Sequence, residues 1–250
     1  MKYSYAFIIT YGRSGSTLLR EILNSIPGAC VRGENGNTLY HLYRSWCTVR
    51  DRKWQFEGED LGPADPWHGI EIVDDAAYRS ELTRSFIDAV LKPPSAATLI
   101  GFKEIRYGPE DMSRTNFFDY LNFLVDSFSN ACLIFNTRDL NEVLASAWWS
   151  SLPQAEEILT ESDRRIREAA ACGAYPSFHI HYNDYAQNMD NLVPLFDFLG
   201  ASFSELALRQ VFCRRHAGGG RPQAELRGWE LRQEGASGGP VTSGEWPGHL

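Results

Sequence analysis

The hydrophobic and polar positions of the first thirty residues predict a buried strand followed by a helix. Tyr5 to Thr10 is an apolar run rich in aromatic and β-branched side chains, which is typical of a buried strand. Apolar residues then recur at helical spacing: Leu18, Leu19, Ile22, Leu23 and Ile26. Pro27-Gly28 ends this helix. The turn at residues 11–17 therefore joins a strand to a helix.

The same two patterns alternate along the rest of the chain. We predict strands at 98–102, 131–136 and 178–182, and helices at 82–91, 117–128, 143–148, 154–171, 192–199 and 206–212. Strands that alternate with helices favour a parallel α/β sheet. Residues 44–69 mix charge, Trp, Gly and Pro without a steady period, and we expect a long functional loop or lid there.

The composition changes near the end of the chain. Gly218-Gly219-Gly220 and Gly238-Gly239-Pro240 lie in a stretch with little hydrophobic periodicity. Such a segment has too few apolar positions to build a core. We therefore predict one domain over residues 1–216 and a mostly disordered, Gly-rich tail over residues 217–250.

Charge and cysteine content narrow the class of protein. The formal net charge of −8 gives no support for binding nucleic acid, so an anionic ligand must be held by local basic residues. The five cysteines are odd in number and contain no C-x-x-C pair, which favours reduced thiols. The sequence has neither a secretory signal nor an apolar stretch long enough to cross a membrane. We expect a cytoplasmic protein without a membrane partner.

The turn between the first strand and helix has the residue types of an anion-binding loop. Its glycines, Gly12 and Gly15, allow the backbone to turn tightly and to present N–H groups to a ligand. The following helix adds unpaired N–H donors and the positive end of its dipole. Side chains suited to phosphate or sulfate complete the loop: Arg13, Ser14, Ser16 and Thr17.

Other polar residues fall where predicted strands end. Lys103 follows the strand at 98–102, Arg138 follows the strand at 131–136, and Tyr182 ends the strand at 178–182. Ligands of parallel α/β sheets bind beyond the carboxyl ends of the strands. We therefore expect these residues to lie near the loop.

Three segments together resemble the sulfotransferases that use PAPS (3′-phosphoadenosine 5′-phosphosulfate). Residues 11–19, Tyr-Gly-Arg-Ser-Gly-Ser-Thr-Leu-Leu, resemble the phosphosulfate loop in its bacterial and carbohydrate-directed form. Residues 135–139, Phe-Asn-Thr-Arg-Asp, with Ser146 eight residues after Arg138, resemble the 3′-phosphate segment. Residues 181–185 and 195–200, which include Tyr182, are similar to the stretch near the adenine.

This resemblance implies a fold, a reaction and roles for named residues. The fold would be α/β and three-layered, P-loop-like, with a central parallel sheet flanked by helices. PAPS would be the donor, PAP (3′-phosphoadenosine 5′-phosphate) the product, and no metal would be required. Gly12 to Thr17, Arg138, Ser146 and Tyr182 would bind the donor, while Arg13 and Lys103 would stabilise the charge that develops as PAP leaves.

The general base departs from the pattern of the cytosolic members. Those have a Lys-x-His pair, whereas Ile105 stands at the position of the histidine here. Several bacterial members that act on carbohydrates use a glutamate shortly after the first helix, which matches Glu34. A carboxylate can accept the proton of an acceptor hydroxyl if its site excludes enough water. Glu104 and His68 are the competing candidates.

Simpler interpretations exist for several of these residues. Arg138 is placed to form a salt bridge with Glu142 one helical turn on, and Glu34 is placed to pair with Arg32. Tyr182 is a core residue in the simplest interpretation, and Lys103 an exposed one.

Two further functions fit part of the pattern: a PAP- or PAPS-binding protein without transfer activity, and a P-loop kinase-like phosphotransferase. No lysine precedes the Ser16-Thr17 pair, so the loop is not a Walker A motif. A carbohydrate or small molecule is the expected acceptor. Its identity and the oligomeric state are not encoded in any motif.

Overall fold

The computed structural model describes residues 1–217, and within this range it contains a five-stranded parallel sheet. The strands are β1 (Tyr5–Ile9), β2 (Ala29–Arg32), β3 (Leu99–Glu104), β4 (Ala131–Thr137) and β5 (Ser177–His181). Their order in the sheet is β2-β3-β1-β4-β5, and every neighbouring pair is parallel. The predicted parallel α/β sheet is confirmed. Residues 1–211 form one compact unit, to which the packing below refers.

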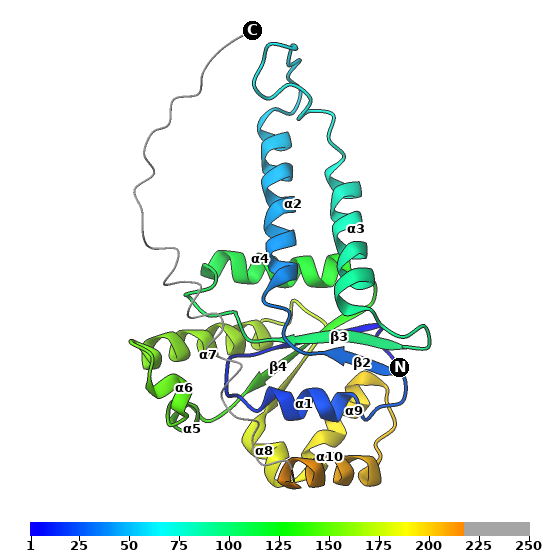
Figure 1. Cartoon of the computed structure of the whole chain (residues 1–250), viewed down its shortest axis with the longest axis vertical. Helices are drawn as coiled ribbons and strands as arrows, with labels where there is room; N and C mark the ends of the chain where they lie inside the picture. The colour runs from blue at the N-terminus through cyan, green and yellow to red at the C-terminus, as the bar shows by residue number, and fades with distance from the viewer. Residues whose placement is uncertain (218–250) are drawn as a thin grey trace. The chain divides into compact units, whose positions relative to one another are not determined.

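Helices cover both faces of the sheet, which makes three layers. Figure 1 shows α4 (Arg114–Ser127) on one side and α1 (Ser16–Leu23), α8 (Tyr182–Gln187) and α9 (Val193–Leu199) on the other. Alternate strand residues point to opposite faces. Phe7 and Ile9 therefore share a buried cluster with Phe117 of α4 and with Leu159 of α7 (Ala155–Ala171). Ile8 is fully buried on the opposite face.

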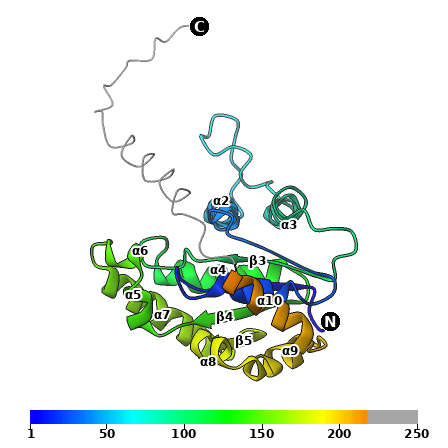
Figure 2. The ribbon, with the colours of Figure 1, turned by 60° about the horizontal axis from the view of Figure 1, so that its bottom comes forward.

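The region that we expected to be a loop begins as a long helix. The helix α2 (Thr38–Gln55) runs beside α3 (Asp75–Ser85), and the pair stands away from the sheet (Figures 1 and 2). The prediction for residues 44–69 was thus wrong as far as Gln55. Trp46 of α2 lies under the guanidinium groups of Arg50 and Arg79, at 4.6 and 5.4 Å from the ring centroid. Contacts with α3 stabilise a helix whose own sequence has little apolar periodicity.

Other differences concern short elements and boundaries. The strand β2 was missed because its four residues are too few to show a period. Short elements also connect longer ones: η1 (Phe86–Leu91), α5 (Leu140–Leu144), α6 (Ala147–Ser150) and η2 (Met189–Leu192). The last helix within residues 1–217, α10 (Glu205–Ala217), includes Ala217, which the prediction placed in the tail. The rest of the predicted tail, 218–250, lies outside the described residues.

Two global expectations can be compared with residues 1–217. None of the five cysteines forms a disulfide. None of the helices in this range combines the length and the apolar character that crossing a lipid bilayer requires.

The core aromatic cluster gives a first testable prediction. Phe7 is fully buried, with its ring 5.0 Å from Phe102 and 4.9 Å from Phe128. Phe7→Ala should lower the free energy of unfolding by about 3–5 kcal/mol, because it leaves a cavity in the centre of the sheet. Trp54 is 76% exposed, so Trp54→Ala is the matched control and should change stability by less than about 0.5 kcal/mol. Urea unfolding of both variants measures the contrast, and equal losses would contradict it.

Candidate active site

The glycine loop after β1 forms an open nest of backbone N–H groups. Arg13 and Gly15 have φ angles of +67° and +81°, in the left-handed region that turns the chain sharply. The helix α1 then starts at Ser16, with no side-chain cap at Gly15 and no acidic residue in its first turn. The first N–H groups of the helix and the positive end of its dipole are therefore available to an anion.

Two aromatic rings pack directly on this loop and explain its glycines. A Cβ atom on Gly12 would lie 1.9 Å from a ring carbon of Trp148, and one on Gly15 would lie 2.0 Å from the ring of Tyr182. Trp149 in addition donates its indole N–H to the Gly12 carbonyl oxygen at 2.9 Å. Any larger side chain at either glycine would displace a ring, so the loop conformation and the aromatic packing depend on each other.

A buried hydrogen-bond network holds the loop from below. The Thr10 and Ser14 hydroxyl oxygens are 2.7 Å apart, and Asn136 Nδ2 donates to the Ser14 carbonyl oxygen at 3.1 Å. Tyr185 donates its hydroxyl to Asn136 Oδ1 at 3.1 Å. All four residues are buried. The Ser14 side chain is therefore engaged under the loop, whereas Arg13 and Thr17 are exposed at its surface.

Tyr11 joins the loop to the segment that follows β4. Its hydroxyl oxygen accepts the Arg138 backbone N–H at 2.8 Å and lies 3.0 Å from Asp163 Oδ1 of α7. Burial, followed by the neighbouring Asp163 carboxylate, raises the pKa of Tyr11 well above its usual value. The hydroxyl therefore stays protonated and links the loop to the segment after β4, the two segments predicted to bind anions.

Arg138 lies beside the loop, and the salt bridge considered from the sequence is present. Its Nε and Nη2 atoms donate to Glu142 Oε2 at 3.0 and 2.7 Å. Its Nη1 atom donates to the Arg13 carbonyl oxygen at 3.1 Å, and its guanidinium lies 4.4 Å from the Tyr182 ring centroid. Loop, Arg138 and Tyr182 are thus brought together, as predicted.

Ser146 has a buried hydroxyl group that is not satisfied within the protein. Its hydroxyl oxygen is buried and has no hydrogen-bond partner in the structure. A buried hydroxyl without a partner costs about 1–3 kcal/mol, so such groups usually await a ligand or an ordered water. Ser146 precedes α6, the helix whose Trp148 and Trp149 pack on the loop. The orphaned hydroxyl fits the anion contact predicted for this residue.

A second group of charged residues forms where β2 and β3 end. Lys103 is 5% exposed, and its ammonium forms an ion pair with Glu34 Oε1. Arg106 Nη1 is 3.7 Å from Glu34 Oε2. The pair forms because Arg32 of β2 is level with Phe102 of β3, which places the residues that follow them in the sequence side by side.

Two of the simpler interpretations made from the sequence can now be compared with this geometry. Lys103 is buried rather than exposed. Arg32 does not pair with Glu34 and instead donates to the carbonyl oxygens of Leu91 and Lys92, both at 2.8 Å.

The competing bases lie in different surroundings. Glu104 is 1% exposed and accepts N–H groups on both carboxylate oxygens. His68 lies in the segment between α2 and α3, where its Nδ1 is 2.7 Å from the Leu61 carbonyl oxygen. Figure 1 shows that this segment is at the end of the helix pair that is away from the sheet. Glu34, whose side chain is 35% exposed, is the accessible carboxylate beside Lys103.

Two asparagines beside Glu34 were not singled out from the sequence. Both polar atoms of the Asn35 side chain, and Oδ1 of Asn37, are buried without a hydrogen-bond partner. Their signal in the sequence is only their position next to Glu34. Because amides can both donate and accept hydrogen bonds, these groups can meet a polar ligand at this end of the site.

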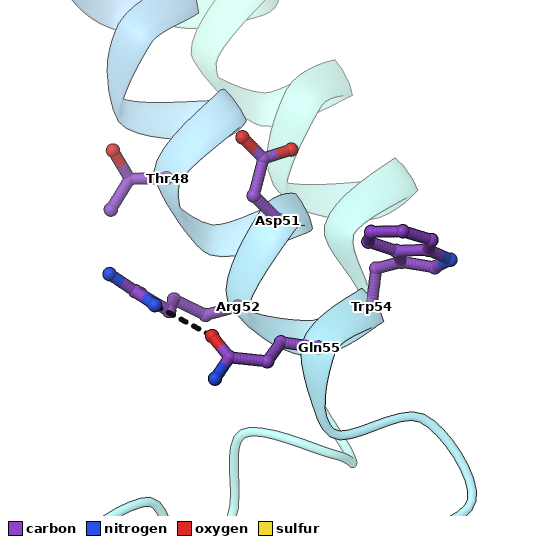
Figure 3. A pocket seen from close by; sticks show the side chains of 5 residues that line it. All are labelled: Thr48, Asp51, Arg52, Trp54 and Gln55. Carbon is purple, nitrogen blue, oxygen red and sulfur yellow. Dashed lines mark hydrogen bonds between the residues drawn. The ribbon is translucent and has the colours of Figure 1, made fainter.

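Neither of two grooves on the described surface has residues 11–17 in its lining. The groove in Figure 3 encloses about 910 Å³ along α2 and is lined by Thr48, Asp51, Arg52, Trp54 and Gln55. It lies on α2, away from the charged groups described above. The charged side chains described above, and not these grooves, therefore define the candidate site.

The second groove, of about 1030 Å³, lies at the same edge of the sheet as the glycine loop. It is lined by Pro109 and Glu110, which follow β3, and by the start of α7. Both segments lie at the carboxyl edge of the sheet, because α7 runs back from that edge towards β5. Burial is the largest cause that raises the pKa of Glu110, and burial with the Glu110 charge raises the pKa of Asp111 to about 6.

The arrangement is that of an α/β protein in which a strand, a glycine loop and the uncapped start of a helix lie at the carboxyl edge of a parallel sheet. The model of the sulfotransferase family matches residues 6–205. The chain therefore belongs to the sulfotransferase family and is an enzyme of sulfuryl transfer, a class that acts on small-molecule acceptors. No curated protein was found to match the chain.

Three solved structures were found to resemble the chain. The sulfotransferase domain of the olefin synthase from Synechococcus PCC 7002 is 24% identical, with a TM-score of 0.52 over 96% of this chain and 89% of that chain. Sulfotransferase STF9 from Mycobacterium avium is 12% identical (TM-score 0.43; 88% and 70%). Retinol dehydratase, in complex with androsterone and the inactive cofactor PAP, is 17% identical (0.39; 85% and 64%). The first of these likenesses supports the three-layer P-loop-like fold.

The link between the glycine loop and the segment after β4 is testable through Tyr11. Tyr11→Phe removes the hydroxyl that bridges Arg138 and Asp163, and should lower the free energy of unfolding by about 1–3 kcal/mol because buried partners lose their bonds. The Tyr78 hydroxyl makes an exposed bond to Ser45, so Tyr78→Phe is the matched control and should cost less than about 0.5 kcal/mol. Thermal unfolding of the two variants measures the difference. A Tyr11→Phe protein as stable as the control would refute the link.

Proposed function

We propose that the protein transfers the sulfuryl group of PAPS to a hydroxyl group of a carbohydrate or other small-molecule acceptor and releases PAP. The observation that carries the proposal is the placement of two groups of polar residues. Arg138 bonds to the loop before the uncapped start of α1, and the orphaned Ser146 hydroxyl precedes α6, whose tryptophans pack on that loop. A Lys103–Glu34 pair stands at neighbouring strand ends. The first group suits a donor with two anionic ends, and the second suits proton transfer.

The donor would be held by the loop and by the segment after β4. The N–H groups of residues 12–17 and the Arg13 side chain would bind the phosphosulfate. Arg138 and Ser146 would bind the 3′-phosphate. Glu142 would then share the Arg138 guanidinium with the phosphate or leave it, since it occupies two of its N–H groups here. Tyr182, whose ring already stacks on that guanidinium, would lie beside the adenine.

The donor supplies an activated S–O bond, and the protein supplies position and charge. As the acceptor oxygen bonds to sulfur, the bond from sulfur to the phosphate oxygen breaks and its electron pair stays on PAP. Arg13, Lys103 and the loop N–H groups are the donors for the negative charge that grows there. Fixed donors of this kind each contribute on the order of 3 kcal/mol to transition-state stabilisation.

Glu34 would take the proton of the acceptor hydroxyl. Its carboxylate is partly exposed, and Lys103 and Arg106 orient it from two sides. In this state Lys103 neutralises Glu34. During transfer the ammonium group would turn to the leaving oxygen and free the carboxylate to act as a base. The buried amide of Asn35 and the groove at Pro109 and Glu110 are the nearest candidates for contacts with the acceptor.

The reaction itself is tested with sulfur-labelled PAPS. The full-length protein is incubated with the donor and with a panel of sugars, phenols and aliphatic alcohols, and labelled products and PAP are counted. Sulfated product supports the proposal. PAP binding without transfer to any acceptor or to water would favour a binding protein, and thermal stabilisation by Mg-ATP but not by PAP would favour a kinase.

Glu34 gives the sharpest prediction for catalysis. Glu34→Gln should reduce turnover by about 10²- to 10⁴-fold, which is the usual contribution of a general base. Its affinity for PAP, measured by calorimetry, should not change because Glu34 holds none of the predicted donor contacts. Glu81→Gln, which breaks an exposed ion pair with Arg84, is the control and should be fully active. Normal turnover of Glu34→Gln would exclude Glu34 as the base.

Ser146 separates stability from donor binding. Since the Ser146 hydroxyl has no partner, Ser146→Ala should not lower the melting temperature, yet it should weaken PAP binding by about 1 kcal/mol, roughly five- to tenfold. In the control Ser162→Ala, a hydroxyl that donates to Ile158 is removed from α7, so stability should change and PAP affinity should not. Unchanged PAP affinity in Ser146→Ala would remove this residue from the donor site.

A further inference from the structure

We infer that Glu104 is a positioning residue for Glu34: its buried carboxylate fixes the turn at residues 33–37, directly and through Arg106, so that the carboxylate of Glu34 stays beside Lys103. This inference rests on the proposed function, in which Glu34 is the base. It follows from the hydrogen bonds that Glu104 accepts. Glu104 itself has no role in the proposed transfer reaction.

The first step is the set of bonds that Glu104 accepts. Its Oε2 atom accepts the backbone N–H groups of Asn35 at 3.2 Å and Asn37 at 3.0 Å. Its Oε1 atom accepts the Ile105 N–H and the Arg106 Nη1–H, both at 2.9 Å. The residue is 1% exposed. A buried carboxylate is stable only with such a set of donors, and here two of them belong to the residues that follow Glu34.

The turn at residues 33–37, which Glu104 binds, has an unfavourable backbone conformation. Gly36 and Asn37 are consecutive residues with φ angles of +67° and +61°. The left-handed region is unfavourable for a residue with a Cβ atom, so Asn37 needs compensating bonds. Glu104 binds its N–H group, and Asn37 Nδ2 donates to the Arg106 carbonyl oxygen at 3.2 Å. Without Glu104 the turn loses the contacts that offset its strain.

The third step connects the turn to Glu34 itself. The Arg106 guanidinium lies between two carboxylates, bonded to Glu104 Oε1 and 3.7 Å from Glu34 Oε2. Lys103, on the same strand as Glu104, holds the other oxygen of Glu34. Alternation along β3 sends Lys103 and Glu104 to opposite faces of the sheet. Glu34 is therefore fixed from one face by its partner and from the other through its own backbone.

These contacts also argue against Glu104 as the general base in place of Glu34. An acceptor hydroxyl would need an open oxygen of the carboxylate, and Glu104 has neither solvent exposure nor an oxygen without N–H partners. A carboxylate that acts only through another residue should affect geometry rather than binding. Misplacement of a reacting group by about 1 Å can cost on the order of 100-fold in rate.

The test combines hydrogen–deuterium exchange with a double-mutant cycle. In Glu104→Gln the side-chain NH₂ group faces at least one pair of the N–H donors. We expect faster exchange in the peptide that covers residues 33–38, and turnover of PAPS lowered on the order of 10- to 100-fold, with PAP affinity unchanged. In the Glu34→Gln background the same substitution should cause no further loss, because the base that it positions is already absent.

The controls separate this role from general stability and from the proposed function. Glu81→Gln should leave both exchange and turnover unchanged. Arg106→Gln should lower turnover only when Glu34 is present, while leaving the N–H bonds of Asn35 and Asn37 to Glu104 protected. If Glu104→Gln does not fold, the turnover of Arg106→Gln is measured in its place, because the Arg106 side chain is 37% exposed. Normal turnover of Arg106→Gln then overturns the inference.

Two other results would overturn the inference. One is unchanged exchange at residues 33–38 in folded Glu104→Gln. The other is an equal loss of turnover in both backgrounds, which would mean an effect independent of Glu34. Normal turnover in Glu34→Gln would instead contradict Glu34 as the base. The exchange measurement needs no donor, so it still tests the anchoring of the turn if the protein transfers no sulfuryl group.

Discussion

Parallel pairing of β1 with β3 and β4 is the constraint on which the site depends. Ile8 is level with Lys103, and Ile9 is level with Phe135. The three strands therefore end at the same edge, and the segments that follow them must meet there. Pairing of β2 with β3 brings the turn that carries Glu34 to the same edge. A shift of β3 by one residue against β1 would turn Lys103 to the other face of the sheet.

Local arrangement explains how an acidic chain can offer an anion site. The net charge of −8 is spread over the whole sequence, whereas α1 begins without an acidic residue and Arg13 is exposed at its start. Arg138 and Lys103 both meet carboxylates, Glu142 and Glu34. An incoming donor thus competes with internal ion pairs. Such pairs keep the cations oriented in the absence of a ligand, and in both pairs the carboxylate is partly solvated.

Buried polar groups divide into those that are satisfied and those that are not. Thr10, Ser14, Asn136 and Tyr185 bond to one another under the loop, and Glu104 accepts N–H groups on both oxygens. The hydroxyl of Ser146 and the side-chain amide of Asn35 have no partners. Since satisfied networks rigidify a structure and unsatisfied groups cost free energy, the first set forms the frame of the site and the second set marks where a ligand would contribute bonds.

The sequence alone determined the elements with a clear period and the motifs tied to them: the strand, glycine loop and helix at residues 5–26, the alternation that makes a parallel sheet, and the positions of Arg13, Lys103 and Arg138. It did not reveal β2, whose four residues show no period, or the helical part of residues 44–55, which depends on packing against α3. Only the tertiary structure showed that Glu104 is buried under the turn that carries Glu34, while Glu34 faces its cations. Adjacent positions in β3 point to opposite faces, and which residues meet there is decided by strand register, a long-range property that no local pattern contains.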